Sequence, residues 1–327
     1  MKFGLAFASS IGTEGNSAVE ICKLAEQVGF ESVWGGEHVI FPSSIESKYP
    51  YTADGKVPAT KDTWIPDPLI WLAYVSAAAP SLRLGTCILI LPQRNPLILA
   101  KEIATLDHLT DGKVELGIGV GWLKEEFEAL GVPWERRGAR TDEYVEALHA
   151  VWSGTDIEFH GEFVDFDPLT CTPRPKQEKI PILVGGDTPA AIRRAAKLAD
   201  GYYPGTGDFA ELQKLIADVR QAAEDNDRDP AEIEINAHFS VFGEGDRIEG
   251  VEKMREGELG GSWFRLYLWR AEWNGTIERI WRKVVETKAK NFRPVFVAEN
   301  STSFRGIPPN DSWYSFLNSS TTTPWER

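Results

Sequence analysis

The fold is decided by the stretch Ile180-Pro-Ile-Leu-Val-Gly-Gly-Asp-Thr-Pro189, which leads through a helical pattern to Gly201-Tyr-Tyr203. The apolar run Ile180–Val184 predicts a strand that ends in two glycines. Thr188-Pro189 predicts the cap and first residue of a helix that ends near residue 198. Gly201–Tyr203 predicts the next strand. Two strands joined through a helix run parallel, so this stretch predicts a βαβ unit.

The same order of strand and helix recurs along the chain. Strands are predicted to begin near residues 2, 30, 82, 113, 180, 200, 232 and 262. Eight such units predict an α/β protein with a single (β/α)8 TIM barrel, in which residues 154–179 form an inserted segment. A doubly wound open sheet is the alternative. We place the barrel in residues 1–288 and expect 289–327 to be an atypical, poorly ordered C-terminal extension, because 300–327 hold ten Ser or Thr residues.

Composition excludes several classes of protein. Of the 327 residues, 35 are Lys or Arg and 49 are Asp or Glu, which gives a net charge of −14 and argues against nucleic-acid or anionic-membrane binding. The three cysteines (Cys22, Cys87 and Cys171) argue against a disulfide scaffold or a cysteine metal site. No apolar run approaches about 18 residues, and the N-terminal run is too short for a signal peptide. We therefore expect a cytoplasmic protein.

Three motifs lie where predicted strands end. Val184-Gly-Gly-Asp-Thr188 leads into a helix, whose free N–H groups would suit a phosphate; an ordinary βα turn is the alternative. Gly117-Ile-Gly-Val-Gly121 lacks the third glycine of a dinucleotide fingerprint, which favours tight packing with a ligand against it. Glu37-His38 would face the active-site end of a barrel, where His38 either contacts a ligand and moves a proton or anchors a loop.

An ordered set of further stretches resembles the bacterial luciferase-like superfamily, and within it the coenzyme F420-dependent oxidoreductases. The set includes Pro92-Gln-Arg-Asn-Pro96, Leu116–Trp122 with Glu125-Glu-Phe127, Arg137-Gly138, Pro173-Arg-Pro175 and Asp200-Gly201. The resemblance covers about residues 1–256. Residues 259–327 depart from it, since their charge is 10 − 6 = +4 and they hold six of the twelve tryptophans.

The resemblance implies a (β/α)8 barrel that binds a deazaflavin or a reduced flavin at the carboxyl ends of its strands. It implies a non-proline cis peptide at Cys87-Ile88 behind the ring, a phosphate-binding turn at Gly185 and Gly186, and a ring-contacting histidine at His38. We expect the N–H of Asp187 or Thr188 to complete the phosphate site, and we take His38 and Glu37 as the candidate catalytic residues. Gly119, Gly121 and Trp122 would line the cofactor. Some deazaflavin enzymes place a proton-donating glutamate where this chain has Trp122. The nearest acids are Glu125 and Glu126, one turn later.

The function implied is hydride transfer between F420 and an unidentified small organic substrate. An FMN-dependent monooxygenase that inserts oxygen from O2 is the alternative, and a non-catalytic barrel acting as a binding or partner subunit is a second. The long loop 39–65 contains Tyr49, Tyr51 and Trp64 and is expected to lie over the pocket. A homodimer is left open.

Overall fold

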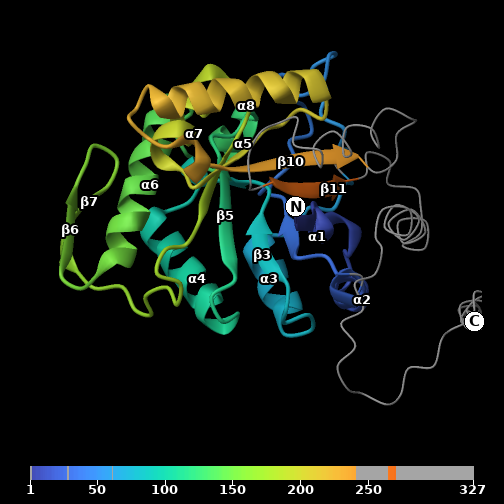
Figure 1. The fold of residues 1–327 in the computed structure, drawn as a ribbon, viewed down its shortest axis with the longest axis horizontal. Helices are drawn as coiled ribbons and strands as arrows, with labels where there is room; N and C mark the ends of the chain where they lie inside the picture. Colours follow the sequence, from blue (N-terminus) through green and yellow to red (C-terminus); the bar gives the residue numbers. More distant parts are fainter. Residues whose placement is uncertain (1, 28, 61, 241–263, 270–327) are drawn as a thin grey trace, which may run out of the picture. The chain divides into compact units, whose positions relative to one another are not determined.

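The computed structural model describes residues 2–27, 29–60, 62–240 and 264–269 (Figure 1). These residues belong to one compact unit, Met1–Val285. The predicted boundary at residue 288 and the tail after it lie outside the described residues. Two further stretches, 251–256 and 277–285, have apolar residues at helical spacing that predict helices, and they also lie outside the described residues. Within the described part, no helix is both long and apolar enough to cross a membrane.

Eight parallel strands form a closed ring. They are β1 (Lys2–Leu5), β2 (Ser32–Gly35), β3 (Arg83–Thr86), β5 (Val114–Gly119), β8 (Ile182–Gly185), β9 (Gly201–Tyr203), β10 (Glu234–Ser240) and β11 (Phe264–Trp269). Each pairs with the next in this order, and β11 pairs with β1, where Lys2 lies opposite Arg265. The short β4 (Leu89–Ile90) extends the pairing with β5. The predicted barrel is confirmed, with every strand beginning within two residues of its expected position.

Helices follow the strands along the chain and lie outside the barrel (Figure 1). The longer ones are α2 (Gly15–Gln27), α3 (Pro68–Ser76), α4 (Pro96–Leu109), α6 (Arg137–Ser153), α7 (Pro189–Leu198) and α8 (Phe209–Glu224). The shorter ones are α1 (Ala8–Ile11), α5 (Lys124–Ala129), η1 (Leu91–Gln93) and η2 (Pro230–Glu232). The insertion at 154–179 carries the antiparallel hairpin of β6 (Ile157–His160) and β7 (Asp165–Leu169), as its short strands predicted.

Local sequence explains where these helices begin. The side chains of Asn95 and Thr188 accept backbone N–H groups at the starts of α4 and α7, and each is followed by a proline that cannot donate one. The spacing of Ser17 and Glu20 predicts a capping box at the start of a helix, which the structure does not show. Helix α2 begins at Gly15, and the Ser17 hydroxyl bonds back to the backbone of Glu14, so Ser17 lies inside the first turn.

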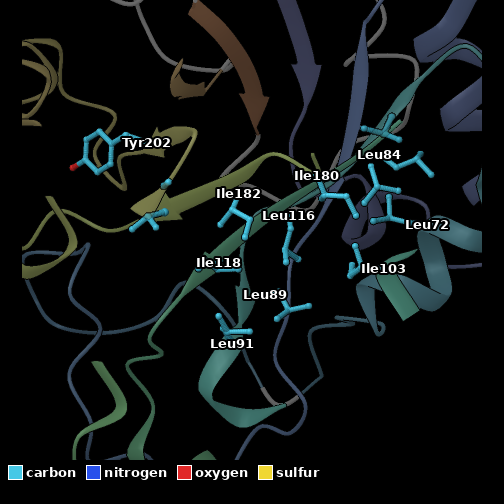
Figure 2. Packing of buried hydrophobic residues seen from close by; sticks show 14 of the residues in the cluster. Leu72, Leu84, Leu89, Leu91, Ile103, Leu116, Ile118, Ile180, Ile182 and Tyr202 are labelled. Atoms are coloured by element: carbon cyan, nitrogen blue, oxygen red, sulfur yellow. The ribbon is translucent and has the colours of Figure 1, made fainter. Parts of the chain in front are cut away.

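The core lies between the strands and their covering helices. Strand β5 is buried along its whole length because neighbouring elements cover both faces. Figure 2 shows side chains of β3, β5 and β8 (Leu84, Leu116, Ile118 and Ile182) near residues of α3 and α4. A separate cluster of buried residues collects inside the barrel: Ala6, Trp34, Cys87, Leu183 and Tyr203, with Phe7 and Ile88 packed against it.

Candidate active site

The carboxyl ends of the strands meet around Ile88. The peptide bond Cys87–Ile88 is cis, as the resemblance implied. Added to Gly119, a Cβ atom would overlap the Ile88 side chain, and one added to Gly185 would lie 2.9 Å from Ile88 Cγ2. A side chain at either of these two predicted cofactor-binding positions would therefore have to displace Ile88, so both glycines leave room for the chain's own side chain, whatever ligand lies beyond it.

Cys87, the residue before Ile88, belongs to the cluster of buried residues inside the barrel. Burial raises the pKa of its thiol to about 12, and the buried Tyr203 side chain belongs to the same cluster. The protonated thiol is a small apolar part of the floor and has no nucleophilic character at neutral pH. Cys87 is thus suited to supporting a ligand from below rather than to reacting with one.

His38 is held by a glutamate from another βα unit. Its Nδ1 lies 3.0 Å from Oε2 of Glu126 on α5, whose side chain is fully buried. The other oxygen of Glu126 accepts the backbone N–H groups of Val39, at 2.6 Å, and Ile40, at 3.3 Å. Nε2 of His38 has no hydrogen-bond partner among the described residues, and the side chain keeps 13% exposure. Nδ1 is therefore held by the hydrogen bond to Glu126, whereas Nε2 is available to bind a ligand.

Glu37, predicted beside His38 as a catalytic residue, makes different contacts. One of its oxygens accepts Nε of Arg94 at 2.8 Å, and the other accepts the N–H of Ile90 at 2.5 Å. Burial raises the pKa of Glu37, and the Arg94 guanidinium opposes that rise. Arg94 also bonds to Asp67 at 2.6 Å. These contacts join the end of β2 to β4 and to the segment after it, which indicates a structural role for Glu37.

Trp122 stands beside His38, with 5.7 Å between ring centroids and an edge-on geometry. Tyr49 also packs edge-on against Trp122, at 5.1 Å, and in turn contacts Tyr51 at 5.3 Å. Phe41 packs edge-on against His38 at 4.9 Å. The predicted loop over the pocket thus contributes three aromatic rings to a wall that includes Trp122.

Glu125, the neighbour of Glu126, holds the same loop at a second place. Its carboxylate accepts the N–H groups of Glu46 and Ser47 at 2.6 and 3.0 Å, and the Ser47 hydroxyl at 2.7 Å. Desolvation raises the pKa of Glu125, but the hydrogen bonds outweigh it and leave the pKa at about 2. Two adjacent acids of α5 therefore anchor the loop.

The predicted phosphate turn connects β8 to α7. Gly186 has φ = 118°, a conformation that favours glycine. The Thr188 hydroxyl caps the helix by accepting the N–H of Ala191 at 3.2 Å, so its oxygen is engaged within the protein. Asp187 accepts the N–H of Gly205 at 2.5 Å, and burial raises its pKa to about 6. The helix start attracts an anion, whereas the ionised Asp187 opposes one.

Sequence reasoning missed a cation at the end of β5. Arg137, at the start of α6, donates from Nε to the carbonyl of Gly121 at 3.2 Å, and its guanidinium lies 3.5 Å from the Trp134 ring centroid. No carboxylate pairs with Arg137 in the part of the chain that the structure describes. Gly121 itself has φ = 78° and packs on Phe127, which places Arg137 at the end of β5. The Arg137-Gly138 stretch is one of those that carry the family resemblance, but nothing in its sequence pattern indicates a role for Arg137 in a site.

Comparison with known proteins gives a consistent assignment. Residues 1–296 match the luciferase-like monooxygenase family. An uncharacterized protein of Mycobacterium tuberculosis is 35% identical over 257 residues, which are 78% of this chain and 86% of that protein. The F420-dependent glucose-6-phosphate dehydrogenase of Nakamurella multipartita is 30% identical over 263 residues, covering 78% and 71%.

Oxygenases are also among the similar proteins. An FMNH2-dependent dimethylsulfone monooxygenase of Pseudomonas putida is 33% identical over 154 residues, covering 46% of this chain and 42% of that enzyme. The crystal structure of the monooxygenase RslO1 from Streptomyces bottropensis is 27% identical, with a TM-score of 0.61 over 79% of this chain and 78% of that one. The chain therefore belongs to the luciferase-like monooxygenase family, a group of barrel oxidoreductases with both F420-dependent and FMN-dependent members.

Proposed function

We propose that the protein is an F420-dependent oxidoreductase that transfers a hydride between the deazaflavin and a small organic substrate carrying a hydroxyl or carbonyl group. The observation that carries this proposal is the His38–Glu126 pair, in which Nδ1 is bonded to a buried carboxylate and Nε2 has no partner among the described residues. Hydride transfer to or from a carbon that bears oxygen requires a proton to leave or reach that oxygen, and a histidine does this well near pH 7.

The residues present fit a flat, anionic cofactor. Ile88 and the glycines around it form an apolar floor, and Trp122 with Tyr49 provides an aromatic wall. The N–H groups at the start of α7 suit the phosphate, and Arg137, held at the end of β5 through Gly121, adds a positive charge at the carboxyl ends of the strands. When bound, the deazaflavin supplies the hydride donor or acceptor. The protein orients that ring, excludes water with its aromatic loop and moves the proton through His38.

Titration with F420, FMN and NADPH side by side tests the cofactor. We expect F420 fluorescence to be quenched at low micromolar protein, with weaker responses for FMN and none for NADPH. Stopped-flow mixing under anaerobic conditions with a panel of small alcohols and carbonyl compounds then tests the reaction. His38→Ala should bind F420 as the parent does and lose hydride transfer. Equal turnover by His38→Ala would remove His38 from the proposed site.

FMN-dependent monooxygenation is the second candidate, and the resemblance to the dimethylsulfone monooxygenase favours it. Under this alternative, tight binding of reduced FMN and substrate-dependent oxygen uptake would replace the F420 signal. The same titration separates the two, because deazaflavin reacts poorly with oxygen. A protein that binds neither cofactor would instead support a role as a binding subunit.

A further inference from the structure

Glu126 has an unusual set of partners for a fully buried carboxylate. All of them come from three consecutive residues, His38, Val39 and Ile40, which lie more than 80 positions earlier in the chain. No lysine or arginine pairs with Glu126 in the described ranges of the chain. A buried carboxylate without a permanent cation is costly, so its contacts must satisfy both oxygens. In this protein His38 contacts Oε2, and the N–H groups of Val39 and Ile40 bind Oε1.

The hydrogen bonds determine which ring nitrogen of His38 carries the proton. The N–H groups of Val39 and Ile40 can only donate, and both are directed to Oε1. Oε2 is left for Nδ1 of His38, and an ionised carboxylate can only accept. Nδ1 must therefore be the protonated nitrogen. In the neutral ring Nε2 then carries the lone pair, and the edges of Trp122 and Phe41 hold the ring in this orientation.

We infer that Glu126 is a positioning residue that fixes the Nδ1–H tautomer of His38, and so makes Nε2 the proton acceptor of the site. The use of that acceptor rests on the proposed function. In alcohol oxidation the carbinol C–H bond breaks with its electron pair passing to the deazaflavin, and the O–H bond breaks with its proton passing to Nε2. A C=O bond forms, and the imidazolium produced faces the Glu126 carboxylate. The carboxyl group of this site, Glu126, therefore bonds to Nδ1 of the histidine. Residue 122, where some deazaflavin enzymes have a proton-donating glutamate, is a tryptophan in this chain.

The isosteric substitution Glu126→Gln tests the inference. The amide oxygen must stay with the N–H groups of Val39 and Ile40, because an NH2 group there would meet two donors. The amide NH2 then faces Nδ1, which has to become the acceptor. The tautomer of His38 is therefore expected to reverse, with the proton on Nε2. In the serine-protease triad, the corresponding change of carboxylate to amide costs about 10⁴ in kcat.

Nitrogen-15 NMR reads the tautomer directly and needs no cofactor or substrate. Spectra are recorded at a pH high enough that every imidazole is neutral, and the His38 signals are assigned by their loss in His38→Ala. In the parent, Nε2 should give the resonance of an unprotonated nitrogen; in Glu126→Gln, Nδ1 should do so. Glu125→Gln is the matched control, since it changes the neighbouring acid on the same helix and should leave the parental tautomer in place.

The outcomes separate the inference from the proposed function. The same tautomer in the parent and in Glu126→Gln overturns the inference, as does a parental His38 protonated on Nε2. A parental His38 protonated on Nε2 overturns the inference even if Glu126→Gln does not fold. With F420 and a substrate, Glu126→Gln should lower the rate of hydride transfer about 10³- to 10⁴-fold while cofactor affinity changes less than about threefold. A reversed tautomer without any F420 turnover in the parent would refute the proposed function and leave the role of Glu126 intact.

Discussion

Replacement of Glu37 by alanine is expected to reduce stability rather than to act on the chemical step. The side chain is buried and bonds to Arg94 and to the N–H of Ile90. Removal of one partner of a buried ion pair costs about 3–5 kcal/mol, because a desolvated charge is left behind. Arg94 keeps its bond to Asp67 and is 18% exposed, which places the loss near the lower end, about 3 kcal/mol.

Urea unfolding of Glu37→Ala against the parent measures this loss as a lower midpoint with an unchanged slope. Glu102→Ala is the control. Glu102 faces the same guanidinium at 3.7 Å but is 44% exposed, so its loss should cost no more than about 1 kcal/mol. A Glu37→Ala protein as stable as the Glu102→Ala protein, but unable to transfer hydride, would refute this reasoning and return Glu37 to the catalytic role predicted from the sequence.

Three further results are expected. Gly186→Val should weaken F420 or FMN binding at least tenfold in a fluorescence titration, because φ is 118° and the Ala191 methyl lies close; unchanged affinity would count against the phosphate site. Asp187, whose pKa is about 6, binds more protons when folded than when unfolded, so the parent should lose stability as pH rises from about 4 through 6. Asp187→Asn should remove that loss and bind FMN about fivefold more tightly at pH 8, a gain of ~1 kcal/mol. Glu125 has a pKa of about 2, so its contribution is complete well above pH 4.5 and disappears as pH falls through 2; thermal unfolding of Glu125→Gln at pH 3 and pH 6 should show a smaller deficit at pH 3 than at pH 6.

Local patterns predict the barrel well because each strand and helix is decided by residues close in sequence. The apolar run at Ile180 and the Thr188-Pro189 start appear in the structure at the expected places. Ser17 shows the limit of such reasoning. Its hydroxyl bonds to Glu14 instead of capping the helix, and nothing in the local pattern separates these two arrangements.

The candidate site was predictable only in part. The position of His38 at a strand end and the cis peptide at Cys87 followed from topology and from the resemblance. The partners of His38 and Glu37 did not, because Glu126 and Arg94 lie 88 and 57 residues away and meet them only when the barrel closes. The glycines were ambiguous for a related reason. A glycine in sequence does not say whether a ligand or, as at Gly119, another side chain occupies the space beside it.

The long loop after β2 is anchored to the barrel chiefly through its main chain. The oxygens of Glu125 and Glu126 accept four of its backbone N–H groups, and Ser47 adds the one hydroxyl. Such anchors do not depend on which side chains the loop carries, because every residue except proline supplies an N–H. Mutations in the loop can thus alter the aromatic wall beside Trp122 while the loop's attachment and the His38–Glu126 pair are preserved. Under the proposed function, this separation would let one scaffold take new substrates by changes confined to a single segment.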